Sequence, residues 1–179
     1  MFTYAVDQQL SLKFPAESDA DALFAQVEAD RIGMRRWLPW VDQTASVADE
    51  RAYLRFAREQ IVQDKLWLAL MVVDHQVAGM IDIHNLDAEN QSGEIGYWIG
   101  PDFRGHGIVT RALKAVEQVA FTELGLHRLG LVAAVENLPS QAVAKRRQFV
   151  QEGVLRDFLQ LDGQAHDVVL FSKLATDSQ

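Results

Sequence analysis

The stretch GPDFRGHGIVTRAL, residues 100–113, combines three glycines and two arginines with an apolar run of helical spacing. Glycines let the main chain turn tightly, and the first N–H groups of a helix point outward without a partner. Together with the helix dipole, such N–H groups form a binding site for an anion. We therefore predict an anion-binding loop here, with a glycine turn that binds nothing as the alternative.

Two common phosphate-binding loops do not fit this stretch. A P-loop needs Gly-Lys followed by Ser or Thr, and the chain contains no such tripeptide. A dinucleotide-binding loop needs a third glycine, but Thr110 stands at that position. That loop also belongs to an early β–α–β unit, whereas residues 100–113 follow a predicted β-meander. Both interpretations fail.

Acidic and imidazole side chains are spaced to share strand faces. Glu94 is in phase with Gly96 and Trp98, so one strand face can carry its carboxylate toward a cleft as a general base. A solvated strand carboxylate is the alternative. Asp82 and His84, two residues apart, could position water or an amine, although the polar face of an edge strand is the favoured explanation. The five histidines show no metal-ligand spacing, so we predict no metal site.

The glycine loop resembles the signature of an enzyme superfamily. Arg104-x-x-Gly107-x-Val109 is similar to the Arg/Gln-x-x-Gly-x-Gly/Ala signature of the GNAT superfamily of N-acetyltransferases. EN-x-x-S-x-x-V at 136–143, EG-x-LR at 152–156 and WLPWVD at 37–42 resemble its subgroup of ribosomal-protein N-terminal acetyltransferases. The resemblance runs from about residue 8 to residue 174, and Val109 departs from the signature's small last residue.

The resemblance implies acetyl-CoA as the cosubstrate and gives roles to named residues. Backbone N–H groups of Trp98 and Ile99 are expected to bind the pantetheine arm and the thioester oxygen. Asn137 is expected to bind the same arm, or else to cap the following helix. Ser140 is expected to donate a proton to the leaving thiolate, or else only to begin that helix; Ala144 stands where many family members carry a tyrosine. The pyrophosphate loop is expected to comprise Arg104, Gly105, His106, Gly107, Ile108, Val109 and Thr110.

The acceptor side is expected around Trp37 and Trp40, in a predicted loop between two helices. The resemblance implies that this region lines the acceptor cleft. We expect Trp40 to line it and Trp37 to pack the two helices against the core. His84 is expected to be a further contact of the acceptor. The function expected is transfer of acetyl to an amine, in first place the N-terminal α-amino group of a ribosomal protein or another peptide. A small amine such as a polyamine, an antibiotic or an amino acid is the second acceptor class. A noncatalytic acyl-CoA-binding or sensing module is the alternative from another class.

The elements that position these residues follow from the spacing of apolar residues and from turn residues. Alternation predicts strands within residues 4–14 that turn near Asp7, and Ser18 and Ser46 are predicted to cap helices that run to about Glu28 and Asp64. The resemblance implies a glycine before Phe149, so Gln148 would carry a small cost if that position takes up a left-handed conformation. The other predicted elements are meander strands at 66–74, 76–86 and 93–100, a helix at 108–124 closed by Gly125, a strand at 128–135, a helix at 140–149 and a hairpin at 154–174 turning at Asp162–Gly163.

Residues 1–179 are read as a single domain of the α/β (α+β) class, because no repeat or linker interrupts them. The resemblance implies a mixed, mostly antiparallel sheet, splayed at its fourth strand and flanked by helices. A net charge of −8 argues against direct nucleic-acid binding and suits cationic acceptors. There is no cysteine, no apolar run long enough for a membrane span and no secretion leader. We expect a cytoplasmic protein without a membrane partner; a homodimer is compatible with these observations.

Overall fold

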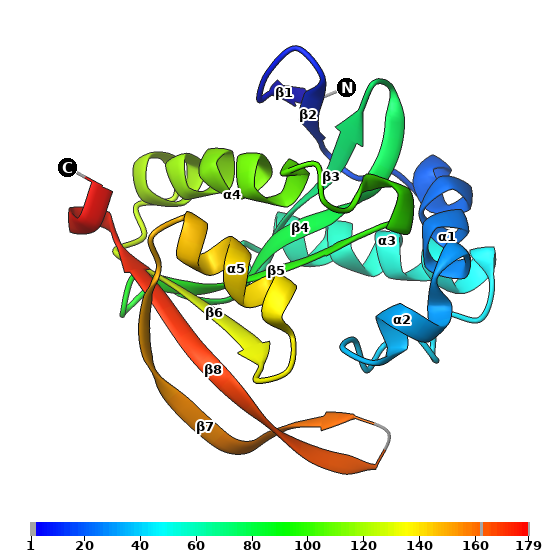
Figure 1. The fold of residues 1–179 in the computed structure, drawn as a ribbon. Coiled ribbons are helices and arrows are strands. Elements are labelled where there is room, and N and C mark those ends of the chain that lie inside the picture. The colour runs from blue at the N-terminus through cyan, green and yellow to red at the C-terminus, as the bar shows by residue number, and fades with distance from the viewer. Residues whose placement is uncertain (1–2, 162, 179) are drawn as a thin grey trace.

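The computed structural model describes residues 3–161 and 163–178, which form one eight-stranded sheet with helices on both faces (Figure 1). The strands are β1 Thr3–Ala5, β2 Leu10–Lys13, β3 Trp67–Val73, β4 Gln76–Asp87, β5 Ser92–Ile99, β6 Arg128–Ala134, β7 Val150–Leu161 and β8 Gln164–Leu174. The α-helices are α1 Ala20–Ala29, α2 Arg31–Arg35, α3 Val47–Val62, α4 Ile108–Gln118 and α5 Leu138–Arg146. Short helical turns cover Glu17–Asp19, Pro101–Phe103, Val119–Glu123 and Ala175–Ser178.

The sheet is antiparallel except at one place. Its strand order is β1-β2-β3-β4-β5-β6-β8-β7, and of the neighbouring pairs β5 and β6 alone run parallel. This confirms the predicted mixed, mostly antiparallel fold and its β3–β4–β5 meander. The parallel pairing is short, covering Ser92 with Arg128, Gly93 with Leu129 and Glu94 with Gly130. Beyond it β5 stays with β4 and β6 stays with β8, so the sheet forks, as the resemblance implied.

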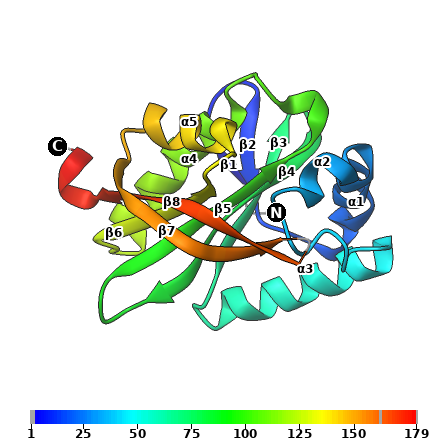
Figure 2. The same ribbon diagram turned by 60° about the horizontal axis from the view of Figure 1, so that its bottom comes forward.

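Each face of the sheet buries its own apolar core. Strand β3 supplies both, because Met71 points to one face and Leu70 to the other. On the first face Leu113 of α4 packs with strand residues such as Ile81. On the second face Leu54 of α3 packs with α1 and with β3. Figure 2 shows α4 and α5 on one side of the sheet and α3 on the other, so the fork is covered from both sides.

One predicted helix cap is confirmed and one is wrong. Ser46 begins α3, and its Oγ accepts the N–H of Asp49 at 3.3 Å. Ser18 does not cap α1, which begins at Ala20 after a short 3-10 turn with Asp19 at its N-cap. The Asp19 carboxylate accepts the N–H of Ala16 and forms a salt bridge with Lys13. A charged acceptor with these two partners fixes the entry into α1, while Ser18 is exposed.

The chain ends its helices with left-handed residues where we predicted them. Gly125 closes the helical run that α4 begins, with φ +67°, after a π-helical turn at Val119–Glu123. Gln148 has φ +60° directly after α5. Gly163 has φ +73° at the turn of the β7–β8 hairpin, and Asp162 lies outside the described residues. Helix α2 was not predicted; among the described helices, none is long and apolar enough to cross a membrane.

A buried ion cluster joins α4, the end of α5 and β8. The Glu117 carboxylate accepts hydrogen bonds from the Arg147 guanidinium at 2.7 and 2.9 Å and from Lys173 Nζ at 2.8 Å. Lys173 Nζ also donates to the Arg147 carbonyl at 2.8 Å. Glu117 and Lys173 are 4% and 3% exposed, so water screens this cluster little.

Candidate functional site

The fork between β5 and β6 creates an open edge on each strand. Gly100 donates its N–H to Ala78 at 2.8 Å and continues the register in which Trp98 pairs with Met80. Since N–H groups alternate in direction along an antiparallel strand, the Trp98 N–H points to β4. The N–H groups of Tyr97 and Ile99 point to the fork instead. Of the two predicted backbone donors, the Ile99 N–H therefore faces the gap, whereas the Trp98 N–H faces β4. The Tyr97 N–H, which was not predicted, also faces the gap.

The glycine loop lies between this strand and α4, and its geometry fits an anion. Gly105 and Gly107 have φ +79° and +68°, a region that favours glycine, and no atom lies within 4 Å of where a Cβ would stand. Gly107 is the N-cap of α4 and supplies no side chain, so the first N–H groups of that helix lack a side-chain cap. Ile108 and Val109 bury their side chains in the core, which explains why valine is accepted at the last signature position.

Both arginines of the loop are held by carboxylates. The Arg104 guanidinium forms an ion pair with Asp30, and its Nε donates to the Ile99 carbonyl at 3.3 Å. Arg111 forms a 2.6 Å ion pair with Asp7. Two backbone N–H groups of the β1–β2 turn and then Arg111 lower the pKa of Asp7. The loop is thus anchored to the β1–β2 turn at one end and to the α1–α2 junction at the other.

On the α5 side of the fork, a serine and a tyrosine share a hydrogen bond. Asn137 caps α5, with its Oδ1 accepting the N–H of Ser140 at 3.2 Å. The hydroxyl oxygens of Ser140 and Tyr97 lie 2.8 Å apart, and Tyr97 also donates to the Ser140 carbonyl at 3.2 Å. Burial raises the pKa of Tyr97 to about 12, so its phenol stays protonated at neutral pH. Sequence reasoning missed Tyr97; its place next to Trp98 in β5 was the available signal.

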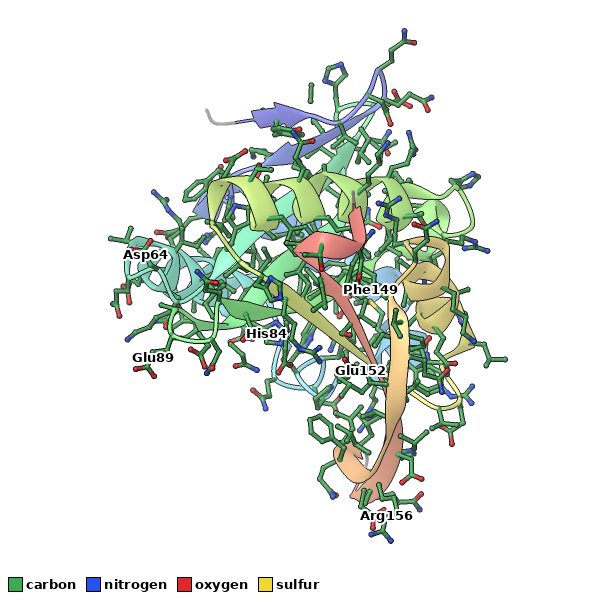
Figure 3. All side chains as sticks on the ribbon, turned by 90° about the vertical axis from the view of Figure 1, so that its left-hand side faces the viewer. Asp64, His84, Glu89, Phe149, Glu152 and Arg156 are labelled. Carbon is green, nitrogen blue, oxygen red and sulfur yellow. The ribbon has the colours of Figure 1, made fainter. Side chains whose placement is uncertain are left out.

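On the other face of the sheet, three ionisable side chains form a row. His84 Nδ1 lies 2.7 Å from Asp82 Oδ1, and His84 Nε2 lies 3.6 Å from Glu94 Oε2. The hydrogen bond to Asp82 raises the pKa of His84, and the negative charges of Asp82 and Glu94 act in the same direction. Figure 3 shows His84 on the meander strands, far from Arg156 on the β7–β8 hairpin. Glu94 stands at the last registered pair before the fork, opposite Gly130.

The predicted acceptor loop reaches the fork through its tryptophans. The rings of Trp40 and Trp98 contact each other, with centroids 5.8 Å apart and planes tilted by 54°. Trp40 is half-buried against the second core, while the Trp37 ring lies under the Arg36 guanidinium, 4.6 Å away. This geometry gives Trp40 a packing contact in addition to the groove-wall role that we expect for it.

The structure brings the expected residues together from both sides of the fork. Tyr97 and Ser140 lie on the side of α4 and α5, and Glu94 and His84 lie on the side of α3. His106, in the glycine loop, is exposed. In the part of the chain that the structure describes, no three His, Asp or Glu side chains could hold a metal ion.

Comparison with known proteins supplies the family. Residues 9–150 match the model of the acetyltransferase (GNAT) domain. The chain is 35% identical, over 97% of its length and 96% of that protein, to the putative ribosomal N-acetyltransferase YdaF of Bacillus subtilis. It is 25% identical, over 99% of its length and 98% of that protein, to the ribosomal-protein-serine acetyltransferase of Escherichia coli. The structure of the microcin C7 self-immunity acetyltransferase MccE in complex with acetyl-CoA and AMP superposes with a TM-score of 0.90 at 26% identity, over 94% of each chain.

Proposed function

The chain belongs to the GNAT family and is an acetyl-CoA-dependent N-acetyltransferase, and from that premise we propose that its acceptor is the N-terminal α-amino group of a protein or peptide. The observation that carries the proposal is the fork, which offers backbone donors on one strand, a hydroxyl pair on one face and a carboxylate on the other. Relatives named for ribosomal proteins align over nearly the whole chain and support this acceptor class.

The cosubstrate would be held by the loop and the β5 edge. The open space at Gly105 and Gly107 admits a pyrophosphate close to the main chain, where helix N–H groups face it. The Tyr97 and Ile99 N–H groups lie where an extended pantetheine arm could run along β5 and where a thioester oxygen could be polarised. Asn137 uses its side-chain oxygen as a helix cap, which leaves its amide N–H groups for the same arm.

The residues at the fork divide the proton transfers between two faces. When the amine nitrogen bonds to the acetyl carbon and the carbon–sulfur bond breaks, one proton must leave nitrogen and one must reach sulfur. Glu94 would take the proton from nitrogen, with His84 beside it to orient the carboxylate. Ser140 would give its hydroxyl proton to sulfur. Tyr97, protonated and 2.8 Å away, would replace that proton on Ser140 Oγ. Solvent would then return a proton to Tyr97 and take the one that Glu94 had gained, which restores both groups for the next turnover.

The acceptor is tested with matched amines and mass spectrometry. Peptides that begin with Ser, Ala or Met are compared with the same peptides carrying a blocked N-terminus and a free lysine, and with spermidine. We expect acetyl transfer to the free α-amino group alone. Glu94→Gln should slow transfer most where the amine is largely protonated, at low pH, because the base then matters most. Transfer only to spermidine would place this enzyme among small-amine acetyltransferases, and binding of acetyl-CoA without transfer would make it a sensing module.

A further inference from the structure

A groove of about 540 Å³ lies between α2 and the β7–β8 hairpin. Figure 1 shows these two elements facing each other at the lower side of the molecule, below α1. One wall comes from α2 and the residue after it, and the other from both sides of the hairpin turn. The lining residues are Ile32, Arg35, Arg36, Leu161, Gln164 and His166.

The described residues that line this groove differ in charge from the molecule as a whole. The chain carries a net charge of −8, yet the described lining residues include two arginines and a histidine and no carboxylate. Arg35 is already engaged in a 2.9 Å ion pair with Asp42, so the basic residues that could bind a ligand here are Arg36 and His166. Arg36 makes no ion pair with any described residue, and the Trp37 ring supports its guanidinium. A stacked guanidinium keeps its N–H groups in a fixed plane, ready for a carboxylate.

The groove also has an apolar side and a route to the fork. Ile32 is 88% exposed, and Leu161, which is 3% exposed, lines the same space. From Arg36 the chain runs through Trp37 to Trp40, whose ring contacts Trp98 of β5. This loop therefore connects the groove with the fork, and a polypeptide with its N-terminus at the fork would reach the groove if it followed the loop.

We propose that this groove binds an acidic stretch of the acceptor polypeptide, just after the amino group that is acetylated; the inference rests on the proposed function. Arg36 and His166 would donate hydrogen bonds to Asp or Glu side chains, and Ile32 would contact an apolar neighbour. The acidic remainder of the enzyme repels such a segment, which directs it to the groove. The groove thus selects among proteins with the same first residue.

The test compares two peptides with the same first residues, one followed by Asp and Glu and the other by Asn and Gln. Wild type should favour the acidic peptide in kcat/KM by roughly fivefold for each ion pair formed, with the ratio falling at high salt. R36E should abolish or invert this preference and favour a lysine-containing peptide. R58E, at an exposed position on α3, is the matched control and should keep the wild-type ratio.

The outcomes separate this proposal from the proposed function. If neither peptide is acetylated, the α-amino acceptor itself is wrong. If both are acetylated equally by wild type and R36E, peptides are acceptors but the groove does not select acidic ones. AMP serves as a competitor, since the MccE structure is a complex with acetyl-CoA and AMP. Competition by AMP through Arg36 without an acidic preference would assign the groove to phosphates and overturn the proposal.

Discussion

At the scale of single residues, the hydrogen bond between Tyr97 and Ser140 is the contact that most directly concerns the proposed chemistry. Ser140→Ala should lower kcat on the order of a hundredfold, because general-acid assistance is lost in the transition state. Tyr97→Phe should cost less, since water can also reprotonate Ser140. Acetyl-CoA binding, measured by thermal shift, should change little in either variant. Ser18→Ala, an exposed serine in a helical turn, is the control, and an unchanged kcat in Ser140→Ala would reduce Ser140 to a helix-start residue.

Glu50 of α3 should make stability fall as pH rises. Its side chain is 1% exposed, its Oε1 has no described hydrogen-bond partner, and burial raises its pKa to about 7. Between the ordinary value of 4.5 and 7, the folded state holds a proton that the unfolded chain has lost. The free energy of unfolding should therefore decrease by about 3 kcal/mol across this window.

Urea unfolding at several pH values tests this linkage. Glu50→Gln should flatten the curve between pH 4.5 and 7 and should be more stable than wild type above it. Glu89→Gln, in the exposed β4–β5 turn, should leave the wild-type curve unchanged. The same slope in Glu50→Gln as in wild type would show that another group titrates.

At the scale of elements, two glycines at opposite ends of one helical run allow a matched test of the loop. Gly107 and Gly125 have φ of +68° and +67°, and a Cβ at either would meet no atom within 4 Å. Valine at either position should destabilise the protein by a similar amount, about 1–2 kcal/mol from the left-handed backbone. At a hundredfold excess over its dissociation constant, acetyl-CoA should stabilise wild type and Gly125→Val by roughly 2.7 kcal/mol. Gly107→Val should lose most of this gain; an equal gain in both variants would move the pyrophosphate elsewhere.

Much of the element order could be predicted because its signals are local. The β3–β4–β5 meander, the cap at Ser46 and the left-handed Gly125 each depend on residues within one or two turns of the chain. The pairing of Tyr97 with Ser140 joins positions 43 residues apart, and the pairing of Arg104 with Asp30 joins positions 74 apart. Neither partner could be chosen from spacing. The resemblance to a family supplied Ser140. That Tyr97 lies beside it follows only from the three-dimensional structure, in which β5 and α5 lie next to each other at the fork.

At the scale of the whole molecule, the buried cluster around Glu117 holds the α4–α5 layer to the C-terminal strand. Glu117→Gln leaves the buried Lys173 and the half-buried Arg147 without a counter-charge, and should lower the free energy of unfolding by about 3–5 kcal/mol. Arg128→Gln is the control, because it breaks a solvent-exposed pair with Glu152. Arg128 and Ser172 lower the pKa of Glu152 to about 2, which shows that the carboxylate interacts with both. Because solvent screens this pair, the loss of stability on breaking it should be limited to about 1 kcal/mol. Equal losses in urea unfolding would mean that burial adds nothing to the cluster.

The fork in the sheet also determines the hydrogen–deuterium exchange rates of individual backbone amides in β5. The N–H groups of Trp98 and Gly100 face β4, whereas those of Tyr97 and Ile99 face the gap. In the free protein, exchange along the part of β5 beyond Glu94, where β6 no longer pairs with it, should alternate between slow and fast from one residue to the next. A pantetheine arm seated in the gap would slow only the fast positions. The amides of Tyr97 and Ile99 then record whether the gap is filled, independently of whether any acetyl group has moved.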